Sequence, residues 1–289
     1  MYNSNLTEID YCSEPKFFRS INELFSCYSA LSKNKIVIIT LQLLLIVCTV
    51  LANLAVFLLK CKTRRSKNIF DLILIGHSIV DGVTGLVDEP LFHIYSLFQY
   101  WPMGETLCYF WNLYDSSINT VTNLHMLYMG WARMRFIMAP NTFSAEVLIR
   151  NPIRVMLSIW IGSFLFWIPI NLAIIGNLPI NEYKCEPYIR PGFIIVNFQF
   201  ISWFFPIFLI ITLNVMTLLK IRDRHRKVCK MTVNNKKKKF QLKLSMQLKL
   251  SIFTTIYLIQ WMPSCIIALI EPWCLCISSS QILDIYWLT

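Results

Sequence analysis

The sequence predicts an all-α membrane protein that crosses the bilayer several times. Hydrophobic residues make up 56% of its 289 residues and charged residues only 15%, against roughly 25% charged in soluble domains. The apolar residues also gather in long blocks instead of spreading along the chain. This composition argues against a cytosolic enzyme, and the high aliphatic and aromatic content excludes intrinsic disorder.

Six apolar blocks are long enough to form transmembrane helices, which need about 20 residues each. They cover residues 36–60, 69–98, 108–134, 154–177, 193–220 and 247–270. A seventh block, 278–289, would form roughly 18 Å of helix, short of a hydrocarbon core of about 30 Å. We therefore expect a seven-helix domain over residues 36–289 whose seventh helix is incomplete, preceded by an N-terminal tail over residues 1–35.

Positive charge is concentrated on one side of the expected membrane. Lysines and arginines follow the first, third and fifth blocks, and the densest run lies in the predicted third loop, 221–246. Cytoplasmic loops carry such an excess, so we expect this loop inside the cell and the N-terminus outside. The net charge of +11 then favours contact with anionic lipid or a cytosolic partner over nucleic acid.

Two features belong to the outer side. Asn5 begins an N-x-T sequence, which makes it a candidate glycan acceptor. Cys108 begins the third block and Cys185 follows the fourth, so a bridge between them would tie the loop over the end of the helix, although sequence alone fixes no connectivity. No metal, phosphate-loop or dinucleotide signature appears, and we expect no enzymatic activity.

Polar residues inside the blocks mark candidate functional positions, because burying an ionisable group in a bilayer is costly without a partner or a cavity. They are Asn53, Asp81, Asp115 and Arg133. Asp115, Asn119 and Thr122 share one face of the third helix by their spacing. Asp115 lies about 10 Å beyond Cys108, and Arg133 lies about 27 Å further along. Asp115 is thus placed to meet an outside ligand, or alternatively to pack helices through a hydrogen bond.

Landmark residues recur in order along nearly the whole chain from residue 36 onward. They are Leu51-Ala52-Asn53 with Asp81; Trp101, Gly104 and Cys108; Asp115; Arg133 with Pro140; Trp160 and Phe166-Trp167-Ile168-Pro169; Cys185-Glu186-Pro187; Pro206; Trp261-Met262-Pro263; and Tyr286-Trp287-Leu288. In this order and register they resemble the motifs of rhodopsin-like (class A) G-protein-coupled receptors. Within that class the chain most resembles the aminergic group, especially muscarinic acetylcholine and histamine receptors.

The resemblance implies a seven-transmembrane bundle of rhodopsin type in the plasma membrane that binds a small cationic biogenic amine, acetylcholine-like or histamine-like. The amine would pair with Asp115 in a low-dielectric pocket, where a charge-assisted contact is strong. The other ligand-binding residues that it implies are Asn119, Ser202, Trp261, Tyr286 and Trp287. Trp111 is either a further aromatic wall of this pocket or part of the helix packing.

Three further sites follow from the resemblance. They are a disulfide between Cys108 and Cys185, a sodium ion at Asp81, Asn53 and Thr122, and coupling to a heterotrimeric G protein through Arg133. The sequence departs from the family around that arginine, whose acidic neighbour is replaced by Ala132, and Lys243 stands where some relatives carry a facing acid. Both changes would weaken an inactive-state contact, so we hypothesise raised basal activity.

Alternative interpretations stay open. Asp115 is structural if the chain is a peptide receptor or another class A receptor, and Asp81 is then a hydrogen-bonded buried acid. The incomplete seventh block fits a fragment of a working receptor or a truncated, non-signalling isoform. A transporter would show paired broken helices or an internal repeat, and neither is visible.

Overall fold

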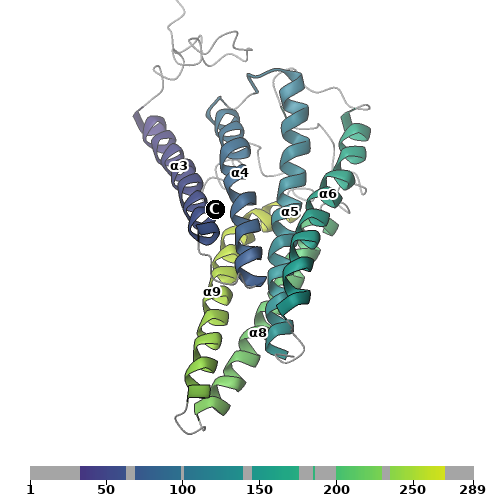
Figure 1. Ribbon diagram of the computed structural model, residues 1–289. Coiled ribbons are helices and arrows are strands. Elements are labelled where there is room, and N and C mark those ends of the chain that lie inside the picture. Colours follow the sequence, from purple (N-terminus) through teal and green to yellow (C-terminus); the bar gives the residue numbers. More distant parts are fainter. Residues whose placement is uncertain are drawn as a thin grey trace, which may run out of the picture. The chain divides into compact units, whose positions relative to one another are not determined.

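The computed structural model describes residues 33–62, 69–98, 101–138, 145–175, 185, 200–229 and 235–270. Within these ranges the chain is helical and forms no strand. The helices labelled in Figure 1 are α3 (Lys33–Lys62), α4 (Ile69–Phe98), α5 (Glu105–Met138), α6 (Ala145–Ile175), α8 (Phe205–Cys229) and α9 (Asn235–Ile270). A π-helical turn, η1 (Phe200–Phe204), runs directly into α8. The prediction of an all-α protein is confirmed.

Each of the six predicted apolar blocks overlaps a helix, but the predicted loop 221–246 is mostly helical. Both α8 and α9 extend into it. Ile221 of α8 and Leu244 of α9 are buried against Ile137 of α5 in one small apolar cluster. Because a helix in a protein is stabilised mainly by packing of its apolar face, this contact accounts for helices that continue past their apolar blocks.

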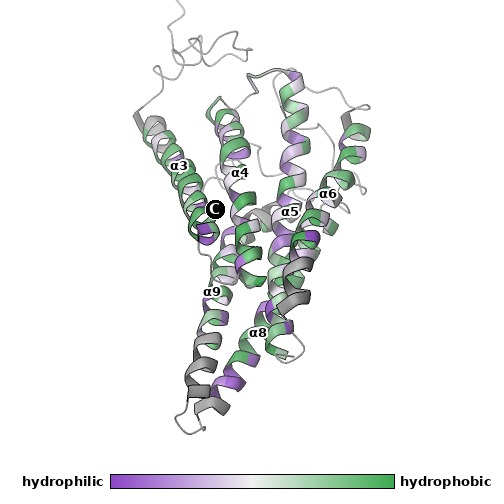
Figure 2. Ribbon diagram, in the orientation of Figure 1, coloured by the Kyte–Doolittle hydropathy of each residue, from purple (hydrophilic) through white to green (hydrophobic). Residues whose placement is uncertain are grey.

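Four of the helices contain segments long and apolar enough to cross a membrane. These segments are Ile39–Lys62, Ile69–Tyr95, Pro152–Ala173 and Ile201–Arg226. Figure 2 shows α3 as hydrophobic over most of its length. α5 is less apolar because its middle carries polar side chains that are buried in the protein. They include Ser117, Asn119, Thr120, Thr122, Asn123 and His125.

The chain divides into two compact units. The first comprises Met1–Thr63, Ser78–Ile118 and Trp160–Ile189, and the second comprises Arg64–His77, Asn119–Ile159 and Arg190–Thr289.

In the first unit α3 packs on α4 at two glycines. A Cβ atom at Gly85 would lie 3.0 Å from a Val50 methyl, and one at Gly82 would lie 3.9 Å from the Cβ of Asn53. Small residues thus let these two helices approach closely.

The second unit is built on an apolar core shared by α4, α5, α8 and α9. Its buried members are Ile69, Phe70, Ile73, Met126, Met129, Ala132, Ile207, Ile210, Tyr257 and Leu258. Trp261 packs against this core from α9. α8 and α9 are in contact and run antiparallel (Figure 1). A Cβ atom at Gly76 would collide with the sulfur of Met156, so a larger residue at this position would require the Met156 side chain of α6 to move.

Candidate functional site

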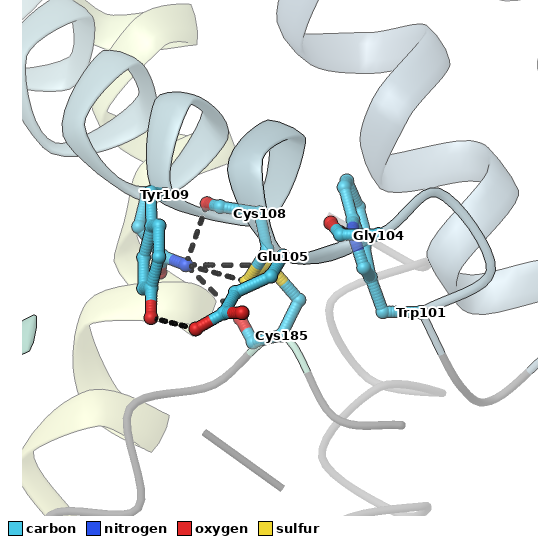
Figure 3. The surroundings of a disulfide bond; sticks show 7 residues. Trp101, Gly104, Glu105, Cys108, Tyr109 and Cys185 are labelled. Atoms are coloured by element: carbon cyan, nitrogen blue, oxygen red, sulfur yellow. Dashed lines mark hydrogen bonds between the residues drawn. A yellow bond between two sulfur atoms is a disulfide. The ribbon is translucent and has the colours of Figure 1, made fainter. Parts of the chain in front are cut away.

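The first group of site residues lies at the start of α5, which we call the disulfide end. Cys108 and Cys185 are each 1% exposed and form a disulfide with Cα atoms 5.4 Å apart. Gly104 has a φ of 79°, a conformation that favours glycine. Its carbonyl oxygen accepts hydrogen bonds from the Cys108 N–H at 3.2 Å and from Trp101 Nε1 at 2.7 Å. This turn therefore positions Trp101 and the disulfide together (Figure 3).

Asn112, one turn after Cys108, ties the bridged segment to α5. Its Nδ2 donates to the carbonyl oxygen of Cys108 at 3.0 Å and to that of Cys185 at 3.2 Å. Glu105 lies in the first turn of α5, where the helix dipole stabilises a carboxylate, and accepts a hydrogen bond from the Tyr109 hydroxyl (Figure 3). Side-chain contacts as well as the disulfide thus fix this end of the helix.

Four rings near the disulfide end form a group that we name the aromatic cluster: Phe92, Tyr95, Trp101 and Trp111. The indole rings of Trp101 and Trp111 stack with centroids 5.0 Å apart. The Tyr95 ring centroid lies 5.7 Å from that of Trp111 and 6.2 Å from that of Trp101, and Phe92 lies 6.3 Å from Trp111. Trp101 covers one face of Trp111, which favours the packing interpretation of Trp111 and leaves its polar edge for hydrogen bonding.

Asp88 of α4 and Asp115 of α5 supply the charge of this region, and we name them the acid pair. The two carboxyl groups interact electrostatically. Trp111 donates its indole N–H to Asp88 Oδ1 at 2.8 Å. Tyr114 is 8% exposed and interacts electrostatically with Asp88, and its hydroxyl has no hydrogen-bond partner among the described residues. Asp88 therefore interacts with the Trp111 indole, the Tyr114 ring and the Asp115 carboxyl group.

The other predicted ligand-binding residues fall in different places. Asn119 is buried on α5, one turn beyond Asp115. Ser202 is buried in η1 and Trp261 is half-buried on α9, both in the second unit. Tyr286 and Trp287 lie outside the described residues, as does the predicted glycan acceptor Asn5. A ligand-binding role for these residues stays a prediction.

The predicted sodium site draws on three helices. Asn53 of α3 and Asp81 of α4 belong to the first unit, where Gly82, next to Asp81, lies against Asn53. The Asn53 amide donates to the Thr49 carbonyl oxygen at 3.0 Å, and Thr122 is buried on α5 in the second unit. Carboxylate, amide and hydroxyl oxygens suit a hard cation. The donor chemistry therefore fits sodium, and its binding stays a prediction.

Arg133 lies near the other end of α5, the arginine end, and is fully buried. Its Nη1 donates to Ser251 Oγ at 3.2 Å and its Nη2 to Thr254 Oγ1 at 2.7 Å, both on α9. Thr254 in turn donates its hydroxyl to the Leu250 carbonyl oxygen at 3.0 Å. Hydroxyl groups thus hold Arg133 where the sequence lacks the expected neighbouring acid, which bears directly on the hypothesis of raised basal activity.

Two further hydrogen bonds join α9 to its neighbours in the second unit. Tyr257 donates its hydroxyl to Asn123 Oδ1 of α5 at 2.6 Å, and both residues are buried. Asn214 of α8 donates to Thr255 Oγ1 at 3.0 Å. A buried polar group that loses its partner costs about 1–3 kcal/mol. These pairs therefore fix how α9 packs against α5 and α8.

Sequence reasoning missed several of these contacts, and only one carried a usable signal. Asp88 is an acid inside the apolar block 69–98, and this position alone makes it a functional candidate. The other contacts, made by Asn112, Asn123 and the hydroxyls that bind Arg133, depend on which faces of two helices pack against each other. Polar residues of these types are common in helices, and their spacing alone singles none of them out.

A comparison with protein families matches residues 52–289 to the model of the 7 transmembrane receptor (rhodopsin family). The match covers most of the chain. The chain belongs to this receptor family. The protein is therefore a multi-pass membrane protein of a receptor family, which agrees with the predicted seven-transmembrane fold class. It also agrees with the prediction that the chain is a receptor and not an enzyme.

The receptor is similar to muscarinic acetylcholine receptors. It is 22% identical to muscarinic acetylcholine receptor M4 of Gallus gallus over 62% of this chain and 37% of that protein. It is also 22% identical to M4 of Xenopus laevis, over 70% of this chain and 42% of that protein. The identity to M2 of Gallus gallus is 22% as well, over 63% of this chain and 38% of that protein. The chain thus aligns with about two fifths of the length of these curated relatives.

Proposed function

We propose that this receptor binds a small cationic amine through Asp115 and signals through a heterotrimeric G protein. Membership of the rhodopsin family and similarity to proteins named muscarinic acetylcholine receptors support the proposal. Acetylcholine is itself a small cation, so a buried carboxylate is the chemistry expected of a related site. The ligand would enter from outside the cell, and the N-terminus would lie on that side of the plasma membrane.

The observation that carries the proposal is the acidic character of the region around Asp115. Residues 78–118 contain five acids and no lysine or arginine. Asp115 is half-buried, two turns beyond the disulfide, and lies next to Asp88 and Trp111. Such an acidic region raises the local concentration of cations and favours their binding.

Ligand binding would then act on the second unit, which contains the residues proposed for coupling. Arg133 would meet the G protein after its hydrogen bonds to α9 rearrange, because a ligand can only shift an equilibrium between states that it binds differently. Asp81, Asn53 and Thr122 would hold a sodium ion as oxygen donors. These roles belong to the proposal along with the amine site.

A panel of biogenic amines tested on receptor-expressing cells checks the proposal. We expect at least one amine to activate the parent, and Asp115→Asn to raise its half-maximal concentration about 30- to 100-fold, since a hydrogen bond to a charged group contributes roughly 1.5–3 kcal/mol. Glu105→Gln is the matched control, because it removes one charge from the exposed first turn of the same helix, and should change the response less than threefold. An equal response of Asp115→Asn and the parent would assign Asp115 a structural role.

A further inference from the structure

Three buried polar residues lie at one level of the second unit, and we name them the polar layer: Arg133 of α5, Thr217 of α8 and Gln247 of α9. Arg133 and Thr217 are 0% exposed, and Gln247 is 1% exposed. Each lies three or four residues, or one helical turn, from the residue that its own helix contributes to one small apolar cluster. The members of that cluster are Ile137, Ile221 and Leu244.

Hydrogen bonds on the other side of the polar layer support this placement. Ser251, one turn after Gln247 on the same face of α9, accepts a hydrogen bond from Arg133 Nη1 at 3.2 Å. Asn214, one turn before Thr217 on α8, donates to a hydroxyl of α9 at 3.0 Å. Contacts on both sides therefore bring the three helices together at the level of the polar layer.

The polar layer contains hydrogen-bonding groups that the described residues leave unsatisfied. Arg133 Nε, Thr217 Oγ1 and both amide atoms of the Gln247 side chain are buried and have no hydrogen-bond partner among those residues. Buried polar groups in proteins nearly always have a partner. The guanidinium N–H, the hydroxyl and the amide NH₂ group can all donate. The polar layer thus offers donors from three different helices.

The charge of Arg133 indicates what these donors bind. A guanidinium group is always ionised in proteins, and burying a charge is costly unless it is paired. The helical residues 119–138, 200–222 and 235–270 contain no aspartate or glutamate, and the η nitrogens of Arg133 donate to hydroxyl groups. Water molecules would satisfy the remaining donors but would supply no negative charge. A small anion would do both.

We propose that the polar layer binds a monovalent inorganic anion, chloride, as the counter-ion of Arg133. The anion accepts hydrogen bonds from Arg133 Nε, the Thr217 hydroxyl and the Gln247 amide. It thereby joins α5, α8 and α9 and stabilises the arrangement in which Arg133 is bound to α9. The inference concerns the arginine end of α5 and does not depend on the proposed amine site.

Thermal unfolding of the full chain in nanodiscs of uncharged phosphatidylcholine tests the inference. The unfolding temperature is measured in potassium chloride and in potassium gluconate at one ionic strength, because gluconate is too large for a buried site. We expect chloride to raise the unfolding temperature by about 3 °C or more, with a saturable dependence on its concentration, since a ligand that binds only the folded state stabilises it.

Two variants remove the proposed donors. Gln247→Leu and Thr217→Val keep side chains of similar size, and each should reduce the chloride-dependent rise by at least half. Thr212→Val is the matched control, because its hydroxyl donates to the Phe208 carbonyl oxygen of its own helix at 2.9 Å, and it should keep the parental rise. The comparison uses the difference between the two salts, so a uniform change in stability does not affect it.

The outcomes decide between an anion and water. Equal unfolding temperatures of the parent in chloride and gluconate refute the site and assign the donors to water. A chloride-dependent rise that Gln247→Leu and Thr217→Val both retain in full places the anion elsewhere and refutes the site as well. Thr217→Ser retains the hydroxyl and should keep the rise, and Gln247→Leu decides the result if Thr217→Val does not fold. Failure of the amine panel would leave this inference standing, and its own failure would leave the amine function standing.

Discussion

The surroundings of the two ends of α5 carry charges of opposite sign and stabilise them by different means. Residues 78–118 contain five acids and no lysine or arginine, whereas residues 119–138 contain two arginines and no acid. At the disulfide end, Asp88 accepts a hydrogen bond from the Trp111 indole and interacts electrostatically with Asp115. At the arginine end, Arg133 donates to two hydroxyls of α9. The acids at the disulfide end suit a cationic ligand, whereas the hydroxyls at the arginine end bind one helix to another.

The largest expected effect is that of removing the disulfide, which is present at only one of the two ends of α5. Cys108→Ser should lower the free energy of unfolding by about 2–5 kcal/mol and abolish amine binding, because Cys185 and the aromatic cluster lose their anchor. Thermal unfolding and calorimetric binding measure both effects. Cys48→Ser, at an exposed free cysteine, is the matched control. Parental stability of Cys108→Ser would show that Asn112 and Gly104 hold this end without the bridge.

A smaller effect is expected at the arginine end. Thr254→Val removes the hydroxyl that accepts from Arg133 Nη2 at 2.7 Å, a charge-assisted bond worth roughly 1.5–3 kcal/mol. Loss of this bond should loosen α5 from α9 and raise basal signalling in cells. Thr212→Val is the matched control, because its hydroxyl bonds to the Phe208 carbonyl of its own helix at 2.9 Å.

The basal-signalling measurement also tests the hypothesis that the altered surroundings of Arg133 activate the receptor. Arg133→Ala supplies the uncoupled baseline. A parent that signals no more than Arg133→Ala would contradict raised basal activity and would show that the hydroxyls of Ser251 and Thr254 replace the missing acid. If Thr254→Val then also remains at that baseline, these hydroxyls do not restrain the inactive state.

The smallest expected effect is that of removing the hydrogen bond from Trp111 to Asp88. Trp111→Phe keeps an aromatic ring against Trp101 and removes the N–H that donates to Asp88. We expect amine affinity to fall about three- to tenfold, the effect of a hydrogen bond of roughly 1 kcal/mol. Trp131→Phe, at a tryptophan that is 48% exposed, should leave affinity unchanged. An unchanged affinity of Trp111→Phe would show that this hydrogen bond does not influence amine binding.

The sequence was informative about features that depend on one helix alone, such as its position in the chain and the charges inside it. Apolar blocks predicted the six helices, and the rarity of charges inside them singled out Asp115 and Arg133. The helical parts of the predicted loop 221–246, residues 221–229 and 235–246, escaped prediction because their stability depends on contacts of Ile221 and Leu244 with Ile137. Contacts between helices depend on the rotation of each helix about its axis, and one sequence constrains that rotation weakly.

The acid pair shows the same limit at the level of a site. Asp88 and Asp115 lie on different helices, 27 positions apart, and no periodicity links them. Either acid alone was visible as a charge inside an apolar block. Their electrostatic interaction became visible only with the packing of α4 against α5.

The exposed surface of α3 has a consequence for how this receptor evolves. Leu44, Leu51 and Leu58 are each more than half exposed, and a surface that meets fluid lipid tails must be apolar but needs no particular shape. Exchanges among leucine, isoleucine, valine and phenylalanine should therefore accumulate there with little selection against them. Gly85, where an added Cβ would lie 3.0 Å from Val50, should resist change. Substitution patterns among relatives would then trace the lipid boundary along this helix.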